Sequence, residues 1–137
     1  MELNFIPSTH IDYAWAIGAS CLAASIDGVE EIMPGQLKMI LSRGERQLIQ
    51  VSDNGETVAW VVFRFDQLPN MRVAHLTNVT AVKPGLKNVM EIAKRAAAEH
   101  GCSEMRISCK PAQSRLFKRY GFEPVYETLK VATWQQI

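Results

Sequence analysis

The first third of the chain carries apolar residues at helical spacing, preceded by one short apolar run. Residues 3–6 form that run and are predicted to be a strand. Apolar positions then recur at helical spacing over 11–24, which predicts one helix. A second helix is expected over 36–41, because Pro34 fits a first helical turn and Gly44 fits the position just past a helix end. The first third should therefore contain one strand and two helices.

The middle of the chain changes to the two-residue period of strands. Runs of β-branched and aromatic residues, or loose alternation, predict strands over 47–51, 58–65 and 73–82. The first connection, 52–57, contains Asn-Gly, the strongest short hairpin signal, and the second, 68–71, reads Leu-Pro-Asn-Met. The three strands should form an antiparallel meander.

The last third alternates between the two periods. Apolar residues at helical spacing over 86–97, closed by Gly101, predict a long helix. A short buried strand over 105–109, a second helix over 111–119 and a final strand over 122–131 should follow. A helix between two strands of one sheet normally makes those strands parallel. We therefore expect an α/β fold of the α+β kind: a central, mostly antiparallel mixed sheet with helices on both faces.

The length, composition and net charge of the chain limit the class of protein to which it can belong. The 137 residues suit a single domain over 1–137, and 47% apolar with 21% charged residues is a normal globular balance. The net charge of +1 gives no overall electrostatic reason to bind nucleic acid or membrane. Three cysteines without zinc-ligand spacing predict reduced thiols and no metal. The N-terminus lacks the pattern of a signal peptide, and no apolar run is long enough to span a bilayer, so a cytoplasmic location is expected.

Three segments resemble the GNAT superfamily of acetyl-CoA-dependent N-acetyltransferases. They are "VTAVKP" (79–84), "AKRAAAEHGCSEMRISC" (93–109) and "SRLFKRYGFEPVYETLKV" (114–131). The "HGC…RLFKRYGF" arrangement also looks like small GNAT-like proteins encoded by bacteriophages, for which the location would be the host cytoplasm or the virion. The Gly-Phe pair has a structural reason of its own, because Gly121 can take positive φ where a helix turns into a strand.

The resemblance implies acetyl-CoA as a cofactor, but the phosphate-binding loop departs from the family pattern. The stretch 82–92 contains a single glycine, Gly85, where the family has paired glycines before the long helix. Amides at the start of that helix would still suit phosphates. The residues expected to bind the cofactor are Val79, Ala81, Lys83, Lys87, Asn88, Val89 and Lys118. The alternative is a plain turn between strand and helix with solvated lysines.

The resemblance also implies a general acid and a base. The family's tyrosine, four residues before the glycine of Gly-Phe, is Phe117 here, and an asparagine often found before it is Lys110. Tyr120 is the remaining candidate acid, with a packed or surface tyrosine as the alternative. His75, on the strand that lies beside the acyl group in this family, is the candidate base, with a structural histidine as the alternative.

An acceptor pocket is expected between the first helices and the meander. Its candidate residues are Asp12, Tyr13, Trp15, Trp60 and Arg64, which suit a cationic amine and serve equally well as core and rim.

Four cations give the last helix a basic face, which leaves three functions open. Lys110, Arg115, Lys118 and Arg119 could meet the phosphates of coenzyme A or of a nucleic acid, or remain solvated. The chain could be an acyltransferase acting on a small-molecule or protein amine. It could also be a catalytically degenerate protein that binds a partner such as a second copy, a virion protein or a host protein. A weak nucleic-acid-binding module is the third and least favoured hypothesis.

Overall fold

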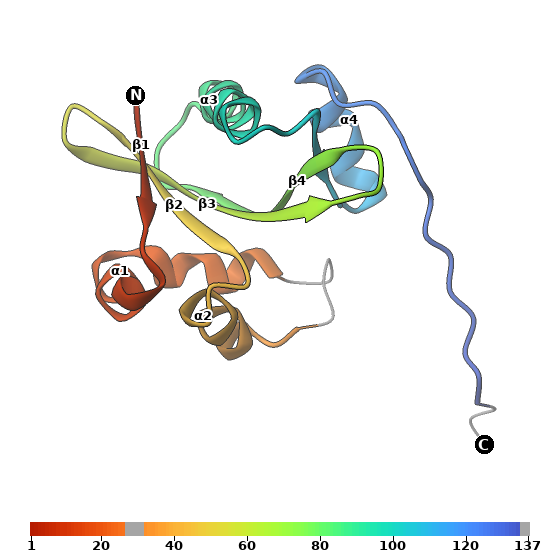
Figure 1. Cartoon of the computed structure of the whole chain (residues 1–137), viewed down its shortest axis with the longest axis horizontal. Coiled ribbons are helices and arrows are strands. Elements are labelled where there is room, and N and C mark those ends of the chain that lie inside the picture. The colour runs from red at the N-terminus through yellow and green to blue at the C-terminus, as the bar shows by residue number, and fades with distance from the viewer. Residues whose placement is uncertain (27–31, 135–137) are drawn as a thin grey trace.

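A twisted sheet forms the centre of the molecule (Figure 1). The computed structural model describes residues 1–26 and 32–134, and all statements below concern these residues. The sheet has the order β1-β2-β3-β4-β5. Its strands are β1 (Glu2–Ile6), β2 (Gln47–Asp53), β3 (Glu56–Gln67), β4 (Arg72–Ala81) and β5 (Glu104–Ile107). Neighbouring strands from β1 to β4 are antiparallel, whereas β4 and β5 are parallel, which confirms the predicted crossover.

Helices cover both faces of the sheet, as predicted (Figure 1). One face carries the short turn η1 (Ser8–His10), α1 (Ile11–Ile17), the 3₁₀ segment η2 (Ala19–Ile26) and α2 (Pro34–Ser42). The other carries α3 (Leu86–Glu99) and α4 (Pro111–Arg119). None of the described helices has the length and apolar character needed to cross a bilayer.

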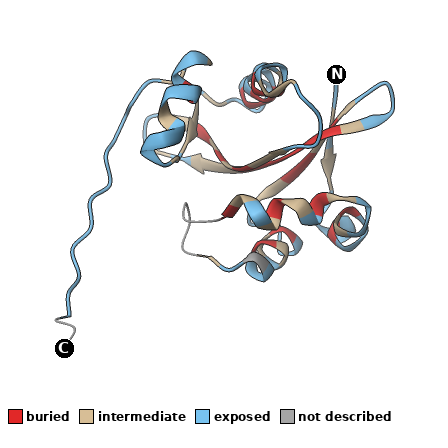
Figure 2. Ribbon diagram, turned by 180° about the vertical axis from the view of Figure 1, so that it is seen from behind, coloured by how far each residue is buried: buried red, intermediate tan, exposed pale blue. Residues whose placement is uncertain are grey.

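The two sides of the sheet bury separate hydrophobic clusters (Figure 2). The upper cluster, beneath α3 and α4, contains Phe63, Leu76, Ala93 and Phe117. The lower cluster, against α1, η2 and α2, contains Leu22, Leu37 and Trp60. Alternation along β3 explains the division, because Trp60 and Phe63 point to opposite faces.

The predicted hairpin turn is present between β2 and β3. Asn54 has φ 53° and Gly55 has φ 80°, so both central residues lie in the left-handed region that a two-residue hairpin turn requires. The Asn-Gly pair therefore sets the pairing of these strands, as expected from the sequence.

The predicted single helix over 11–24 is wrong, because α1 ends at Ile17 and a 3₁₀ segment follows. Gly18 interrupts it with φ 144°, a conformation that favours glycine. A Cβ at Gly18 would also lie 3.4 Å from Nε1 of the Trp60 indole. The break thus brings the backbone close to the buried indole, which a continuous helix with a larger residue would not allow.

The predicted final strand over 122–131 is also absent from the sheet. Phe122 packs against the upper cluster, but residues 123–134 are exposed and extend away from the body (Figure 1). Strand β5 is consequently an edge strand, and its residues are exposed or half-buried rather than buried as expected. Residues 108 and 109, which were expected to belong to it, lie beyond its end.

Candidate functional site

Strand β4 separates from β5 halfway along its length. The parallel pairing comprises four residue pairs, from Val73 with Glu104 to Leu76 with Ile107. Strand β4 then continues to Ala81, and within the described residues nothing pairs with this second half on the β5 side. Among the described residues, the second half of β4 is therefore open on the side where β5 pairs with its first half.

A β-bulge at Thr77 marks the point of separation. In the pairing with β3, Leu76 lies opposite Phe63 and Asn78 lies opposite Val62, so Thr77 is the extra residue. A bulge bends its strand and increases the local twist. The bend therefore falls where β4 loses β5 as a neighbour.

The bulge also turns the Asn78 side chain toward the lower face, where it is 3% exposed. Its Nδ2 donates a hydrogen bond to Oγ of Ser25 in η2 at 3.2 Å, and its Oδ1 accepts one from Oγ1 of Thr77 at 2.9 Å. Nη1 of Arg46 lies 3.5 Å from the same Oδ1. This polar cluster ties the bulge to η2 and to the start of β2.

Cys21 lies on the same face, beside Thr80 of β4. Burial raises the pKa of the Cys21 thiol, and a hydrogen bond with the Thr80 side chain opposes this rise without cancelling it. The thiol is therefore less ionised at neutral pH than a solvated one, which argues against a nucleophilic role.

His75 lies just before the bulge and contacts the segment that follows β5. Its Nε2 is 3.2 Å from Oγ of Ser108, and the tautomer of the ring decides which group donates. Arg64 of β3 and Arg106 of β5 pair with His75 in the sheet. Sequence reasoning missed Ser108, although its place near the end of the predicted parallel strand was the available signal.

Tyr120, the candidate acid, lies on the opposite side of the sheet from His75. It follows α4 and packs, half-buried, against the upper cluster. Phe117, at the position of the family's tyrosine, is buried there and meets Phe122 edge-to-face with ring centroids 5.8 Å apart. His75 faces the lower side, since its neighbours Ala74 and Leu76 belong to the upper cluster. The structure therefore does not bring Tyr120 and His75 together.

Four residues, 82–85, separate the end of β4 from the start of α3. Gly85 precedes the helix with φ 124°. A Cβ at this position would have no other atom within 4 Å, so the space around Gly85 is open. The amides of Leu86, Lys87 and Asn88 occupy the first turn, where an α-helix supplies no acceptor. The Val89 amide instead donates to the Gly85 carbonyl at 3.1 Å, and this bond takes it out of the expected cofactor-binding set.

Lys83, another expected phosphate ligand, forms an ion pair with Glu56. The hydrogen bond and the charge of Lys83 lower the pKa of the Glu56 carboxyl, so the pair is ionised at neutral pH. A phosphate would therefore have to compete with the Glu56 carboxylate for the charge of Lys83. Lys87 is exposed in the first turn of α3.

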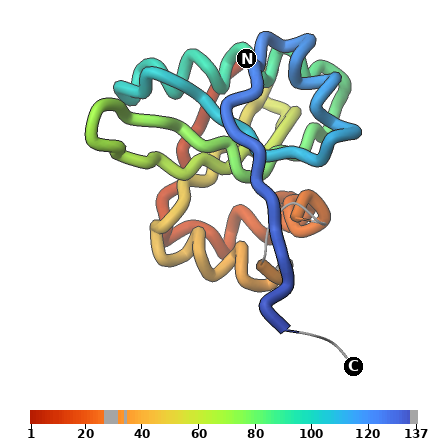
Figure 3. Tube along the Cα trace, turned by 90° about the vertical axis from the view of Figure 1, so that its right-hand side faces the viewer, coloured from red at the N-terminus to blue at the C-terminus, as the bar shows by residue number. Residues whose placement is uncertain are grey.

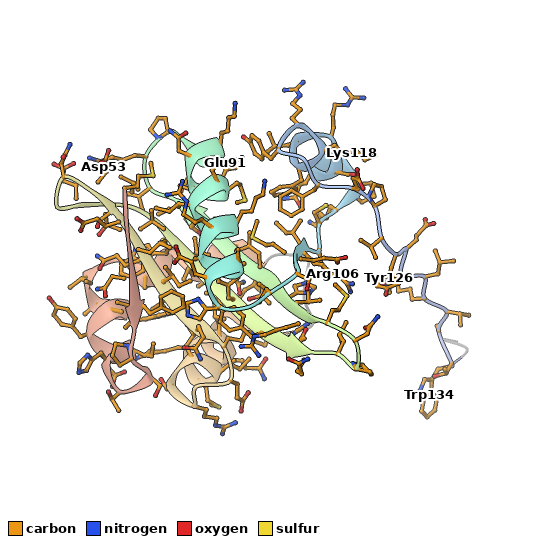
Figure 4. The ribbon with its side chains drawn as sticks, turned by 45° about the horizontal axis from the view of Figure 1, so that its top comes forward. Asp53, Glu91, Arg106, Lys118, Tyr126 and Trp134 are labelled. Atoms are coloured by element: carbon orange, nitrogen blue, oxygen red, sulfur yellow. The ribbon has the colours of Figure 1, made fainter. Side chains whose placement is uncertain are left out.

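The remaining expected cofactor residues lie on β4 and α4. Val79 and Ala81 belong to the half of β4 beyond β5, and Val79 packs partly against the upper cluster. Lys118 is exposed on α4 (Figure 4). With Lys110, Arg115 and Arg119, it leaves the surface of this helix basic.

The expected acceptor wall does not assemble. Trp60 is 1% exposed and belongs to the lower core, while Tyr13 is exposed on α1. The Asp12 carboxylate forms an ion pair with Nζ of Lys38 at 2.8 Å, and Arg64 forms one with Asp66 at 3.0 Å. These side chains serve as core and rim, the alternative that the sequence left open.

Comparison with known proteins shows the fold. No family model and no curated protein matches the sequence. Solved structures match along nearly the whole chain. A ribosomal-protein-alanine N-acetyltransferase from Brucella melitensis is 12% identical with a TM-score of 0.66, covering 98% of this chain and 100% of that one. A glucosamine-6-phosphate N-acetyltransferase from Arabidopsis thaliana is 13% identical with a TM-score of 0.61, covering 96% and 97%. A soil metagenomic aminoglycoside acetyltransferase solved with sisomicin is 10% identical with a TM-score of 0.59, covering 99% and 95%.

Proposed function

We propose that this chain, which has the GNAT fold, is an N-acyltransferase that takes an acetyl group from acetyl-CoA and transfers it to an amine. The observation that carries the proposal is the departure of β4 from β5 at Thr77, directly before the turn into α3. An unpaired strand edge offers backbone amides and carbonyls to an extended ligand. The amides of 79–81 would polarise the acyl carbonyl.

The start of α3 fits the phosphates of the proposed cofactor. Leu86, Lys87 and Asn88 present first-turn amides, Gly85 has no side chain to cap them, and the first turn contains no acidic residue. Lys87 adds a positive charge there, and Lys118 is a further candidate on α4. When bound, the cofactor supplies its acetyl group as a thioester.

His75 is the proposed base for the acceptor amine. Proton removal leaves the amine nitrogen with the lone pair that attack on a carbonyl requires. Before the acceptor binds, the contact of Ser108 with Nε2 of His75 fixes the orientation of the ring. The acceptor amine or a water molecule would then replace the Ser108 hydroxyl at Nε2. Because Tyr120 packs on the opposite side of the sheet, we assign no proton transfer to it, and solvent protonates the departing coenzyme A thiolate.

A thiol-release assay tests this function. The chain is incubated with acetyl-CoA and a panel of primary amines that includes aminosugars, polyamines and peptides with free N-termini, and free thiol is measured over time. Amine-dependent release that falls strongly in His75→Ala supports the proposal. Release no faster than the uncatalysed rate with every amine, from a folded protein, contradicts it.

One observation favours a binding function as the second candidate. Residues 123–134 expose apolar side chains without contributing to the fold. Together with Phe117 at the position of the family's tyrosine, this suits a GNAT-fold protein that captures a protein partner. The basic surface of α4 would suit a nucleic-acid role, but its cations are also explained by solvation.

A further inference from the structure

Two arginines and a histidine form one row across the sheet, near the end of the pairing of β4 with β5. The register places Arg64 of β3 and Arg106 of β5 opposite His75 of β4, one on each side. All three belong to the lower face, because their neighbours along each strand lie in or pack against the upper cluster: Phe63, Phe65, Ala74, Leu76, Met105 and Ile107. All three are half-buried, so solvent reaches the row.

Arg46, directly before β2, adds a third guanidinium group on the same side. Its Nη1 lies 3.5 Å from Oδ1 of Asn78, whose side chain is buried against the lower face. Cationic side chains directly opposite one another destabilise a sheet. A local arrangement of this kind, which works against stability, is typical of a functional site. An anionic ligand would offset the repulsion within the row.

Two carboxylates hold the guanidinium groups of Arg64 and Arg106 in place. Nε of Arg64 donates to both carboxylate oxygens of Asp66, at 3.0 and 3.1 Å, and Nε of Arg106 donates to Oε2 of Glu104 at 2.9 Å. Both acids lie opposite Val73, in the next row along the strands. Within the described part of the chain, the two Nη groups of Arg64 donate no hydrogen bond. That edge of a guanidinium group can bind a carboxylate or a phosphate through two parallel hydrogen bonds.

Tyr126 covers the row at the Arg106 end. Its ring lies against the Arg106 guanidinium, which is 5.4 Å from the ring centroid. Figures 1 and 3 show the chain after α4 passing this edge of the sheet on its way to the C-terminus. The side chain of Arg106 is 20% exposed and that of Arg64 is 41% exposed. A ligand therefore has its more open access to the row beside Arg64 and His75.

We propose that the acceptor is a small primary amine that carries a carboxylate or a phosphate, and that Arg64 and Arg106 bind this anionic group beside His75. The inference rests on the proposed function and names its substrate class. Side chains directly opposite in a sheet have Cβ atoms about 5 Å apart, so one small molecule can reach both Arg64 and His75. One ammonium proton passes to His75, and the amine nitrogen bonds to the acyl carbon. The C–S bond breaks with its electron pair on sulfur, and the second ammonium proton passes to solvent.

Matched pairs of amines test this substrate class with the full chain and acetyl-CoA. L-alanine is compared with alaninamide, and O-phosphoethanolamine with ethanolamine. For at least one pair, kcat/KM should be about tenfold or more higher for the anionic member, since hydrogen bonds between charged groups are strong. The pair with the larger ratio identifies the anion. In the double variant Arg64→Gln, Arg106→Gln the ratio should fall toward one. The control Lys94→Gln, Arg95→Gln, which alters two exposed cations of α3, should keep the native ratio.

NMR of the native chain gives a second measurement that does not depend on the folding of a variant. The Nε–H signals of Arg64 and Arg106 should shift saturably with the anionic member of the preferred pair and not with its neutral partner. Shifts no larger than that of Arg95 overturn the inference. Acetylation of the neutral members at equal or higher kcat/KM, or a native ratio in the double variant, overturns the inference and leaves the proposed function standing. No acetylation of any amine contradicts the proposed function, and the acceptor class falls with it.

Discussion

Nε2 of His75 lies 3.2 Å from the hydroxyl oxygen of Ser108, at the place where the pairing of β4 with β5 ends. One residue belongs to β4 and the other follows β5, so their contact bridges the two strands as they begin to separate. In the proposed enzyme this is where the acceptor amine loses its proton.

Substitution of these two residues should separate a base from a positioning residue. We expect His75→Ala to lower kcat by about 10²- to 10⁴-fold, the usual contribution of a general base. Ser108→Ala should lower kcat less, while the dependence of kcat on pH keeps its shape, because the imidazole remains. The acid limb of the kcat–pH profile should disappear in His75→Ala. Equal losses from both variants with identical profiles would remove His75 from this role.

Release of Lys83 should strengthen cofactor binding. The Glu56 carboxylate pairs with Lys83, and its lowered pKa keeps it ionised at neutral pH. Glu56→Gln abolishes that negative charge, so Lys83 becomes available to phosphate, and we expect a several-fold lower Kd for coenzyme A at low salt. Glu99→Gln, at the far end of α3, makes the same change in net charge and should leave Kd unchanged.

The same ion pair predicts a pH dependence. Because the folded pKa of Glu56 lies below its unfolded value, the pair stabilises the fold above the unfolded pKa, and this stabilisation is lost as pH falls through the folded pKa. Acid should therefore release Lys83 in the native chain, and the difference in Kd between native chain and Glu56→Gln should shrink. A difference that grows on acidification would contradict the pairing.

Two glycines provide a matched test of the break after α1. Gly18→Ala should lower the free energy of unfolding by about 1–3 kcal/mol, because φ 144° strains an L side chain and the new Cβ approaches Nε1 of Trp60. Gly35→Ala, in α2 with open space around it, should be neutral or stabilise by up to about 1 kcal/mol. Denaturant unfolding measures both, and equal effects would mean that Gly18 needs no special conformation.

Cys21 should react slowly with alkylating reagents. Its raised pKa leaves less thiolate at neutral pH, and the pH at which alkylation reaches half its maximal rate should lie above that of a solvated thiol. The rate can be followed by mass spectrometry of the peptide containing Cys21. Thr80→Val removes the hydrogen bond that opposes the shift, so it should move the midpoint further upward. A midpoint at or below that of a free thiol would contradict the burial of this group.

The sequence predicted most elements because their signals are local. The Asn54-Gly55 turn fixed one hairpin, and Pro111 begins α4 where expected. The prediction failed where distant contacts decide the outcome. Gly18 breaks a helix because the indole of Trp60, distant in sequence, lies beside it. Residues 122–131 have the composition of a strand, but a strand also needs a neighbour, which composition does not supply.

The candidate site was predictable in its elements but not in its contacts. The residue pattern predicts the strand of His75, the resemblance implies its place beside the acyl group, and the order of elements predicts its parallel neighbour. Ser108 as its partner depends on the register of β4 with β5, which no local pattern gives. The ion pair between Lys83 and Glu56 likewise depends on which residue of the β2–β3 hairpin faces the turn before α3.

Calorimetric titration of the full chain with coenzyme A tests the central claim most directly. That claim is that the second half of β4 and the first turn of α3 form a cofactor site. We predict saturable binding of one coenzyme A per chain, weakened several-fold or more by Lys87→Glu, and unaffected by Lys94→Glu further along the same helix. No heat and no thermal stabilisation at millimolar coenzyme A would contradict the account, as would binding that Lys87→Glu and Lys94→Glu weaken equally.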